Sequence, residues 1–327
     1  MKAVAIGVDI GGTNIKLGLV DTRGRVLARD TFLTGSAPGR PALMRRLVAH
    51  MEILRQTARQ NQWKLTGVGI GAPGPIDVER GRIYFFPNIP GWKDTPLKAL
   101  LEKRLKLPVY LDNDANVMAL AEFLFGAGRG VQNIIALTLG TGVGGGIVVH
   151  GRLFHGPHYS AAEIGHLTIN ENGPRCACGS RGCIETYVGN GYFVRDVRQK
   201  LKAGRASVLK KWIKEGQELS PLLVKKAAQK GDTLAKEMWT QTGGHLGTAL
   251  AGLVNILNPE RIVIGGGVAQ AGELLFRPIR ETIRKKAFPI AYRSVKVVPA
   301  VLGTDAGLIG AAALVLAPAR KRENAHQ

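Results

Sequence analysis

The chain has 327 residues and 45% hydrophobic content, which is enough material for two packed domains. No apolar stretch is long enough and free enough of charge to predict a membrane span. The formal net charge of +21 is compatible with an anionic ligand, but the basic segment 195–236 contains few aromatic residues, so it is interpreted as a solvated helical face and no specific nucleic-acid partner is expected.

The predicted elements begin with a buried strand at residues 4–9, a glycine-rich turn at residues 11–14 and a returning strand at residues 15–20. A third strand at residues 26–32 completes a meander. The N-terminus lacks the basic and apolar regions of a signal peptide, so we expect a cytoplasmic protein with reduced thiols.

A helix is predicted at residues 41–60, where apolar side chains recur at helical spacing. Short buried strands follow at residues 68–72 and 109–111, and each ends in a turn that is rich in proline, glycine or polar residues. A second helix is predicted at residues 117–125, with a glycine pair at its end.

The opening pattern then recurs as a strand at residues 133–139, a glycine-rich corner at residues 140–146 and a return at residues 147–150. An internal duplication of one α/β unit explains this recurrence more simply than chance does.

The rest of the chain carries a predicted helix at residues 243–257 and a strand at residues 261–264 that ends in three glycines. A last strand is predicted at residues 294–300 and a closing helix at residues 305–316.

Glycine corners between strands let backbone N–H groups approach a phosphate without obstruction from side chains. Neither corner has the P-loop spacing, and the Rossmann fingerprint does not fit because the first corner returns to a strand instead of opening a helix. Two corners on repeated meanders, with a third glycine cluster, nevertheless predict a nucleotide site. Asp9 ends the first strand, and a carboxylate beside phosphates predicts a magnesium ion between them. Lys16 either adds charge to this site or is a surface lysine of its strand. The candidate nucleotide-binding residues are Asp9, Gly11, Gly12, Thr13, Asn14, Lys16, Gly140, Thr141, Gly142, Gly265, Gly266 and Gly267.

All three cysteines, Cys176, Cys178 and Cys183, lie in one short stretch, and His166 precedes them. Three thiols and one imidazole complete a tetrahedral zinc shell, and a shell with no open position is structural. The cysteines could instead be buried small hydrophobic residues, or two of them could form a disulfide. The glycines among them suit a tight turn around an ion, so the sequence predicts one structural zinc.

A second group of polar residues lies near strand ends and tight turns, where short amides and carboxylates can pair with the vicinal hydroxyls of a sugar. Asp114 stands at a junction between a strand and a helix, so one interpretation is that it caps the helix and has no other role. The alternative is that Asp114 orients a sugar hydroxyl and accepts its proton during phosphoryl transfer. The candidate sugar-binding residues are Asn88, Asn113, Asp114, Glu163, His166 and Glu185.

The chain resembles the ROK family (repressors, open reading frames and sugar kinases) over residues 3–316. The resemblance rests on the sequences DIGGTN from Asp9, GAPGP from Gly71, DNDAN from Asp112, EIGH from Glu163 and CACGSRGCIE from Cys176. It implies the actin-like ATPase (ribonuclease H-like) fold, with two duplicated α/β lobes around a central cleft. We expect a small lobe of residues 1–113, to which a C-terminal helix at 305–327 returns, and a large lobe of residues 114–304 that contains the zinc site.

The resemblance also implies residue roles. Asp114 would be the catalytic base, and Gly74 would join the other candidates in contacting the sugar. His166, Cys176, Cys178 and Cys183 would hold zinc, with the second ring nitrogen of His166 toward the sugar. Family members are often dimers or tetramers, so a homo-oligomer is expected.

The motifs around residues 87–92 and 111–116 are most similar to those of bacterial glucokinases of this family. Because the first strand begins at residue 3, no room is expected for the helix-turn-helix of ROK repressors. The implied reaction is ATP-dependent phosphorylation of a hexose at its 6-hydroxyl, with glucose as the expected sugar. An N-acetylhexosamine kinase is the alternative enzyme, and a sugar sensor without turnover is the alternative of another class.

Overall fold

The computed structural model describes residues 1–36, 39–86 and 91–323. Its N-terminal part forms a five-stranded sheet of order β3-β2-β1-β4-β7. The first three strands form an antiparallel meander, and β4 and β7 join it in parallel. The bounds are β1 Ala3–Ile10, β2 Asn14–Asp21, β3 Val26–Leu33, β4 Lys64–Ala72 and β7 Val109–Asn113.

The second five-stranded sheet repeats this plan in the order β10-β9-β8-β11-β12. Again a meander of three strands is extended by two parallel strands. The predicted duplication and the predicted fold class are therefore confirmed. The bounds are β8 Ile134–Leu139, β9 Val143–Val149, β10 Arg152–Leu153, β11 Arg261–Gly265 and β12 Lys296–Pro299.

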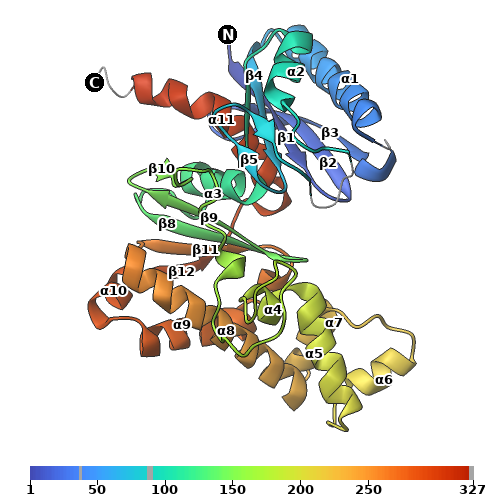
Figure 1. Cartoon of the computed structure of the whole chain (residues 1–327), viewed down its shortest axis with the longest axis vertical. Coiled ribbons are helices and arrows are strands. Elements are labelled where there is room, and N and C mark those ends of the chain that lie inside the picture. The colour runs from blue at the N-terminus through green and yellow to red at the C-terminus, as the bar shows by residue number, and fades with distance from the viewer. Residues whose placement is uncertain (37–38, 87–90, 324–327) are drawn as a thin grey trace.

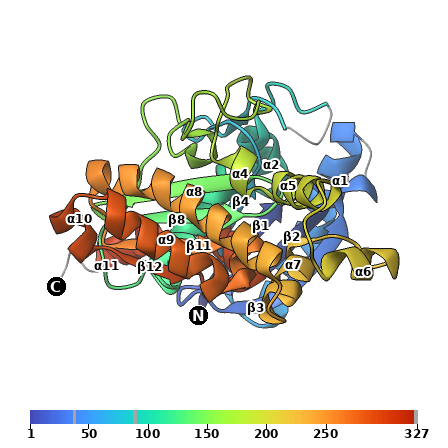
Figure 2. The same cartoon turned by 90° about the horizontal axis from the view of Figure 1, so that it is seen from below.

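Helices cover the outer face of each sheet, and two more lie between the sheets (Figure 1). Leucines of α1 and α2 share a core with the first sheet, and α8 and α9 lie across the second sheet, as the view from below shows (Figure 2). The central layer consists of α3 and α11, so the two sheets contact each other mainly through these helices. The bounds are α1 Gly39–Gln60, α2 Leu97–Leu105, α3 Asp114–Phe125, α8 Thr233–Leu257, α9 Glu273–Lys286 and α11 Ala306–Glu323.

The basic segment runs from within α5 through α6 and α7 to the start of α8, and α5, α6 and α7 extend from the second sheet (Figure 1). Its lysines are mostly exposed, as expected for a solvated face, while Trp212 is buried beneath Lys226 and Lys230, whose amines lie 5.4 Å from its ring centre. The remaining helices and short strands are α4 Glu185–Val188, α5 Asn190–Lys202, α6 Leu209–Lys214, α7 Pro221–Gln229, α10 Pro289–Ser294, β5 Ile76–Asp77 and β6 Arg82–Ile83. Single 3-10 turns are η1 Thr34–Ser36, η2 Ile164–His166, η3 Val268–Ala271 and η4 Gly303–Asp305.

The central helices approach their neighbours at backbone distance. A Cβ atom placed on Gly69 of β4 would lie 1.7 Å from the carbonyl oxygen of Ala311 in α11. One placed on Gly310 of α11 would lie 1.7 Å from the carbonyl oxygen of Val117 in α3. Only glycine permits such contact between backbones.

A fully buried carboxylate, Glu122 of α3, fixes the segment in which the chain returns from β12 to α11. One oxygen of Glu122 accepts hydrogen bonds from the backbone N–H groups of Val301 and Leu302, at 3.0 and 2.9 Å. The other accepts from the N–H of Ala127 at 2.8 Å. A buried carboxylate is stable only when such donors replace water.

The predicted corner at residues 140–146 is wrong in its second half, because β9 already begins at Val143. Glycine in this strand makes room for α3: a Cβ on Gly146 would lie 2.5 Å from the Cβ of Ala119. The helix predicted at 117–125 begins at Asp114, and the helix predicted at 243–257 begins at Thr233. The lobe boundary between residues 113 and 114 stays a prediction.

No helix in the described part of the chain is both long and apolar enough to span a bilayer.

Candidate active site

Two adjoining cavities open between the sheets, and Asp114 lines both. The first cavity has a volume of about 560 Å³ and is bordered by Asp9, the glycines after β11 and the segment that leads into α11. It is called the hinge-side cavity, because this segment connects the second sheet to the central helix. The second cavity has a volume of about 600 Å³ and is bordered by the corner after β8 and by the residues around His166. It is called the knuckle-side cavity, after the turn that carries the three cysteines. Ala115, Thr138 and Gly266 also line both cavities, so the two spaces are continuous around Asp114.

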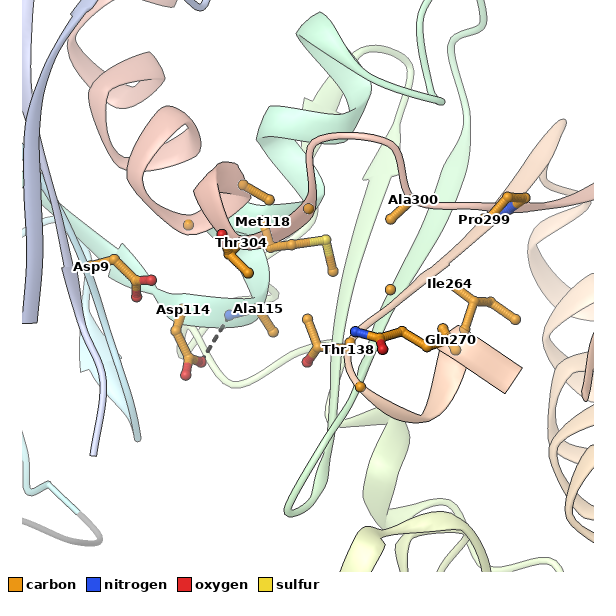
Figure 3. Close-up of a pocket in the computed structure, with 17 residues that line it drawn as sticks. Asp9, Asp114, Ala115, Met118, Thr138, Ile264, Gln270, Pro299, Ala300 and Thr304 are labelled. Carbon is orange, nitrogen blue, oxygen red and sulfur yellow. Dashed lines mark hydrogen bonds between the residues drawn. The ribbon is translucent and has the colours of Figure 1, made fainter. Parts of the chain in front are cut away.

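In the hinge-side cavity, Asp9 and Asp114 lie on one wall, and Thr138 and Gln270 face them from the other (Figure 3). Burial raises the pKa of Asp9, although the charge of Lys16 opposes this shift. Two acidic side chains on the same wall of a cleft favour a cation between them and an anionic ligand.

Asp114 is the first residue of α3, immediately after β7. The helix cap is Asn113, whose side-chain oxygen accepts from the N–H of Ala115 at 2.9 Å, while Asp114 accepts from the same N–H at 2.8 Å. Burial, followed by the negative charge of Asp9, raises the pKa of Asp114 to about 6, with a smaller contribution from Glu163. A carboxyl group with this pKa is suited to accept a proton near neutral pH.

The knuckle-side cavity brings together polar residues from distant parts of the chain. Asn113 donates from its side chain to the carbonyl oxygen of Gly74 at 3.3 Å, and Glu185 accepts from the N–H of Val143 at 2.9 Å. Six of the residues predicted to contact a sugar line this cavity, namely Gly74, Asn113, Asp114, Glu163, His166 and Glu185. Asn88 lies outside the described residues.

The predicted nucleotide-binding residues do not all line the same cavity. Asp9 and residues 265–267 line the hinge-side cavity, and residues 140–142 line the knuckle-side cavity. Gly11, Gly12, Thr13 and Asn14 form the tight turn from β1 to β2, with the N–H of Gly11 donating to the carbonyl oxygen of Asn14 at 3.0 Å.

None of these four turn residues is among the described residues that line the two cavities, so their contact with phosphate stays a prediction. Lys16 donates to the carbonyl oxygen of Thr304 at 3.0 Å, at the border of the hinge-side cavity. Lys16 therefore connects β2 to the segment before α11.

The predicted metal ligands converge. The ligand atoms of His166, Cys176, Cys178 and Cys183 all lie within 4.8 Å of one another. All three cysteines are free and Cys178 is exposed, which argues against a disulfide and against three buried hydrophobic residues. Nδ1 of His166 lies 3.8 Å from the Cys176 sulfur, so this ring nitrogen faces the thiol cluster.

Several cavity residues were not predicted from the sequence. Thr138, Gln270 and Thr304 line the hinge-side cavity, and Phe85 and Tyr159 line the knuckle-side cavity. Thr138 lies two residues before the first glycine of the second corner, and this position could have identified it. The others carry no local motif and are brought in by the fold.

Two sheets of the same strand order, a central helical layer and a cleft lined by acidic residues define the actin-like ATPase class of fold. The chain belongs to the ROK family, whose model matches residues 5–318. A glucokinase of Thermotoga maritima is 39% identical over 314 residues, which are 96% of this chain and 98% of that protein.

Solved structures of the same family agree with this fold. A ROK family glucokinase from Streptomyces griseus, crystallised with glucose and AMPPNP, is 36% identical with a TM-score of 0.78, and the match covers 95% of this chain and 99% of that one. A ROK family transcriptional regulator, a homologue of the Escherichia coli Mlc protein, is 30% identical with a TM-score of 0.88, and the match covers 97% of this chain and 78% of that one.

Proposed function

We propose that the protein is an ATP-dependent glucokinase, which transfers the terminal phosphoryl group of ATP to the 6-hydroxyl of glucose. The observation that carries this proposal is the position of Asp114. It lies where a cavity lined by six candidate sugar ligands meets a cavity lined by Asp9 and a glycine cluster. The similarity to glucokinases over nearly the whole chain supports the same reaction.

In this mechanism, Asp114 orients the 6-hydroxyl of the sugar for in-line attack and accepts its proton. Glu163, His166, Glu185 and Asn113 hold the other hydroxyls in the knuckle-side cavity. Magnesium, when bound with ATP, neutralises phosphate charge, and Asp9 is placed to hold it directly or through water. Backbone N–H groups of residues 140–142 and 265–267 would donate to the phosphates, and the glycines among them leave room for this approach.

We assign one structural zinc ion to the cluster of His166 and the three cysteines. Three thiolates and one imidazole are a donor set that zinc prefers, and the four ligand atoms lie within 4.8 Å of one another. Glu185 follows Cys183 by two residues, and Glu163 precedes His166 by three. The zinc would therefore hold the walls of the sugar site in place without touching the reacting atoms.

We place the enzyme in the cytoplasm, where three reduced thiols can persist as metal ligands. We also propose that it forms a dimer or tetramer, as the family resemblance implies. Closure of the two lobes, with a boundary between residues 113 and 114, would exclude water from the reacting phosphate.

The substrate is tested by initial rates of ADP formation with glucose, mannose, fructose, allose, N-acetylglucosamine and N-acetylmannosamine. We expect kcat/KM for glucose to exceed that for either acetylated sugar by at least about tenfold, because an acetamido group needs extra room at C2. A preference for an acetylated sugar would instead assign an N-acetylhexosamine kinase. Sugar binding without ADP formation would assign a sensor.

The pH dependence of the reaction follows from the raised pKa of Asp114, which is about 6. Below that pH the carboxyl is protonated and cannot accept the proton of the 6-hydroxyl, so kcat/KM should fall as the pH decreases through about 6. Circular dichroism over the same range serves as the control for folding. A rate that stays constant down to about pH 5, with the fold intact, would contradict this assignment of Asp114.

A further inference from the structure

A buried carboxylate that the mechanism above does not use lies two residues before the proposed base. Asp112 is the second-last residue of β7, and its side chain is only 1% exposed. One of its oxygens accepts from the N–H of Asn113 at 2.7 Å and from the side-chain amide of Asn116 at 2.9 Å. The other oxygen pairs with Nε2 of His155 at 2.7 Å.

Each of the first two bonds fixes part of the first turn of α3. Asn113 is the cap of this helix, and its side chain also reaches the carbonyl oxygen of Gly74. Asn116 is the third residue of the helix. Asp112 therefore holds the residues on both sides of Asp114, whose direction depends on the path of this turn.

His155 comes from the other sheet, in the loop that follows β10. Its side chain is 22% exposed, and it reaches across the interface between the sheets to Asp112. In the described part of the chain, no other side chain that can carry positive charge forms an ion pair with Asp112. The hydrogen bond to Asp112 raises the pKa of His155, although partial burial opposes this shift.

The described neighbours of His155 include an aromatic ring and, beyond it, an acidic residue. Within its own loop the ring of Tyr159 lies edge-on to the imidazole, with ring centres 6.1 Å apart. The hydroxyl of Tyr159 donates to Glu79 at 2.9 Å. Asp77 and Arg80 influence the pKa of Tyr159 from the hairpin of β5 and β6, whereas the group on β7 that shifts the pKa of His155 is Asp112.

A carboxylate taken out of water is costly unless a partner charge and hydrogen bonds compensate it. Asp112 has three donors, and only His155 can also supply charge. Loss of that charge would leave Asp112 poorly compensated two residues before Asp114, and the cap of α3 would then be free to shift.

We propose that His155 is a positioning residue: as an imidazolium paired with Asp112, it fixes the first turn of α3 and so holds Asp114 at the angle that the sugar hydroxyl requires. This inference rests on the proposed function of Asp114. It gives the loop after β10 a role in turnover that is separate from contact with the sugar.

The proposal is tested with the full-length enzyme and three variants: His155→Ala, His155→Gln and, as a matched control in the same loop, His158→Gln. His158 is exposed and is not among the described residues that line either cavity. For the sugar with the highest kcat/KM, the values of kcat and KM are measured from mildly acidic to alkaline pH. The melting temperature of each variant is measured as well.

We expect His155→Ala to lower kcat by roughly 30- to 100-fold while KM for the sugar changes less than about threefold, because a small displacement of a reacting group costs rate more than binding. His155→Gln keeps a hydrogen-bond donor without charge, so its kcat should be within about tenfold of the wild-type value at neutral pH. The wild-type kcat should decrease at alkaline pH toward that of His155→Gln, whose profile should lack this decrease. His158→Gln should behave as the wild type does.

A wild-type kcat in His155→Ala would overturn the proposal, as would an alkaline decrease that persists unchanged in His155→Gln. If His155→Ala does not fold, the proposal is tested by the pH profile of kcat in His155→Gln alone: an alkaline decrease as in the wild type contradicts it, and loss of this decrease supports it. Failure of the proposed function is a different result: the wild-type protein would phosphorylate no hexose, or Asp114→Asn would remain active. Either result would also remove the basis for a positioning role of His155.

Discussion

Replacing Asp114 by asparagine is expected to lower kcat for glucose phosphorylation by at least about a thousandfold, while glucose still binds. Asparagine has nearly the same shape, but it cannot accept the proton of the 6-hydroxyl. The other polar residues of the knuckle-side cavity remain in place, so the dissociation constant for glucose should change by less than about fivefold. Steady-state kinetics and calorimetric titration with glucose measure the two effects separately.

The matched control for this substitution is Asp196→Asn, on the exposed face of α5, where Asp196 pairs with Arg195. This change also converts an aspartate to an asparagine, but it lies outside both cavities and should leave kcat unaltered. Near-normal turnover in Asp114→Asn would remove Asp114 from the role of base and leave it only a structural one at the start of α3.

Loss of zinc should have the second large effect. We expect Cys176→Ser to reduce the bound zinc well below one ion per chain, to lower the melting temperature, and to decrease kcat/KM for glucose by at least about tenfold. The reason is that the metal would join His166 to the loop of the three cysteines, and Glu163 and Glu185 lie within three residues of these ligands along the chain. Elemental analysis, a melting curve and initial rates test the three parts.

Ser180→Ala is the control for the zinc prediction, because Ser180 lies in the same short loop but is not one of the four predicted ligands. It should keep both zinc and activity. A wild-type preparation stripped of metal by a strong chelator, yet fully active and unchanged in melting, would show that the cluster does not support the sugar site.

Local patterns were sufficient to predict the parts of the site that depend on neighbouring residues. The spacing of Cys176, Cys178 and Cys183 with His166 predicted a cluster, and the four ligand atoms converge. The two glycine corners predicted a duplication, and the two sheets share one strand order. Each of these signals consists of short motifs in the sequence, so it could be recognised without knowledge of the tertiary fold.

Other features depend on contacts that the sequence does not display. The glycines of β9 suggested a corner because glycine weakens a strand. In the structure, Gly144 and Gly146 make room for α3, and Gly145 makes room for Ala162 and Ile164. The helix α9 contains Pro278 and was not predicted. The pair of His155 and Asp112 joins residues 43 positions apart on different sheets, and neither belongs to a motif that indicates the other.

The backbone contacts of the central layer also limit how this protein can be made more heat-resistant. Exchange of glycine for alanine commonly gains about 0.4–1 kcal/mol of stability where the backbone permits it. At Gly69 and Gly310 the added methyl group would overlap a carbonyl oxygen of the adjoining helix, so the same exchange should unfold the enzyme rather than strengthen it. Substitutions intended to raise heat resistance would therefore begin at the exposed lysines of α6 and α7, which lie far from α3 and α11 (Figure 1).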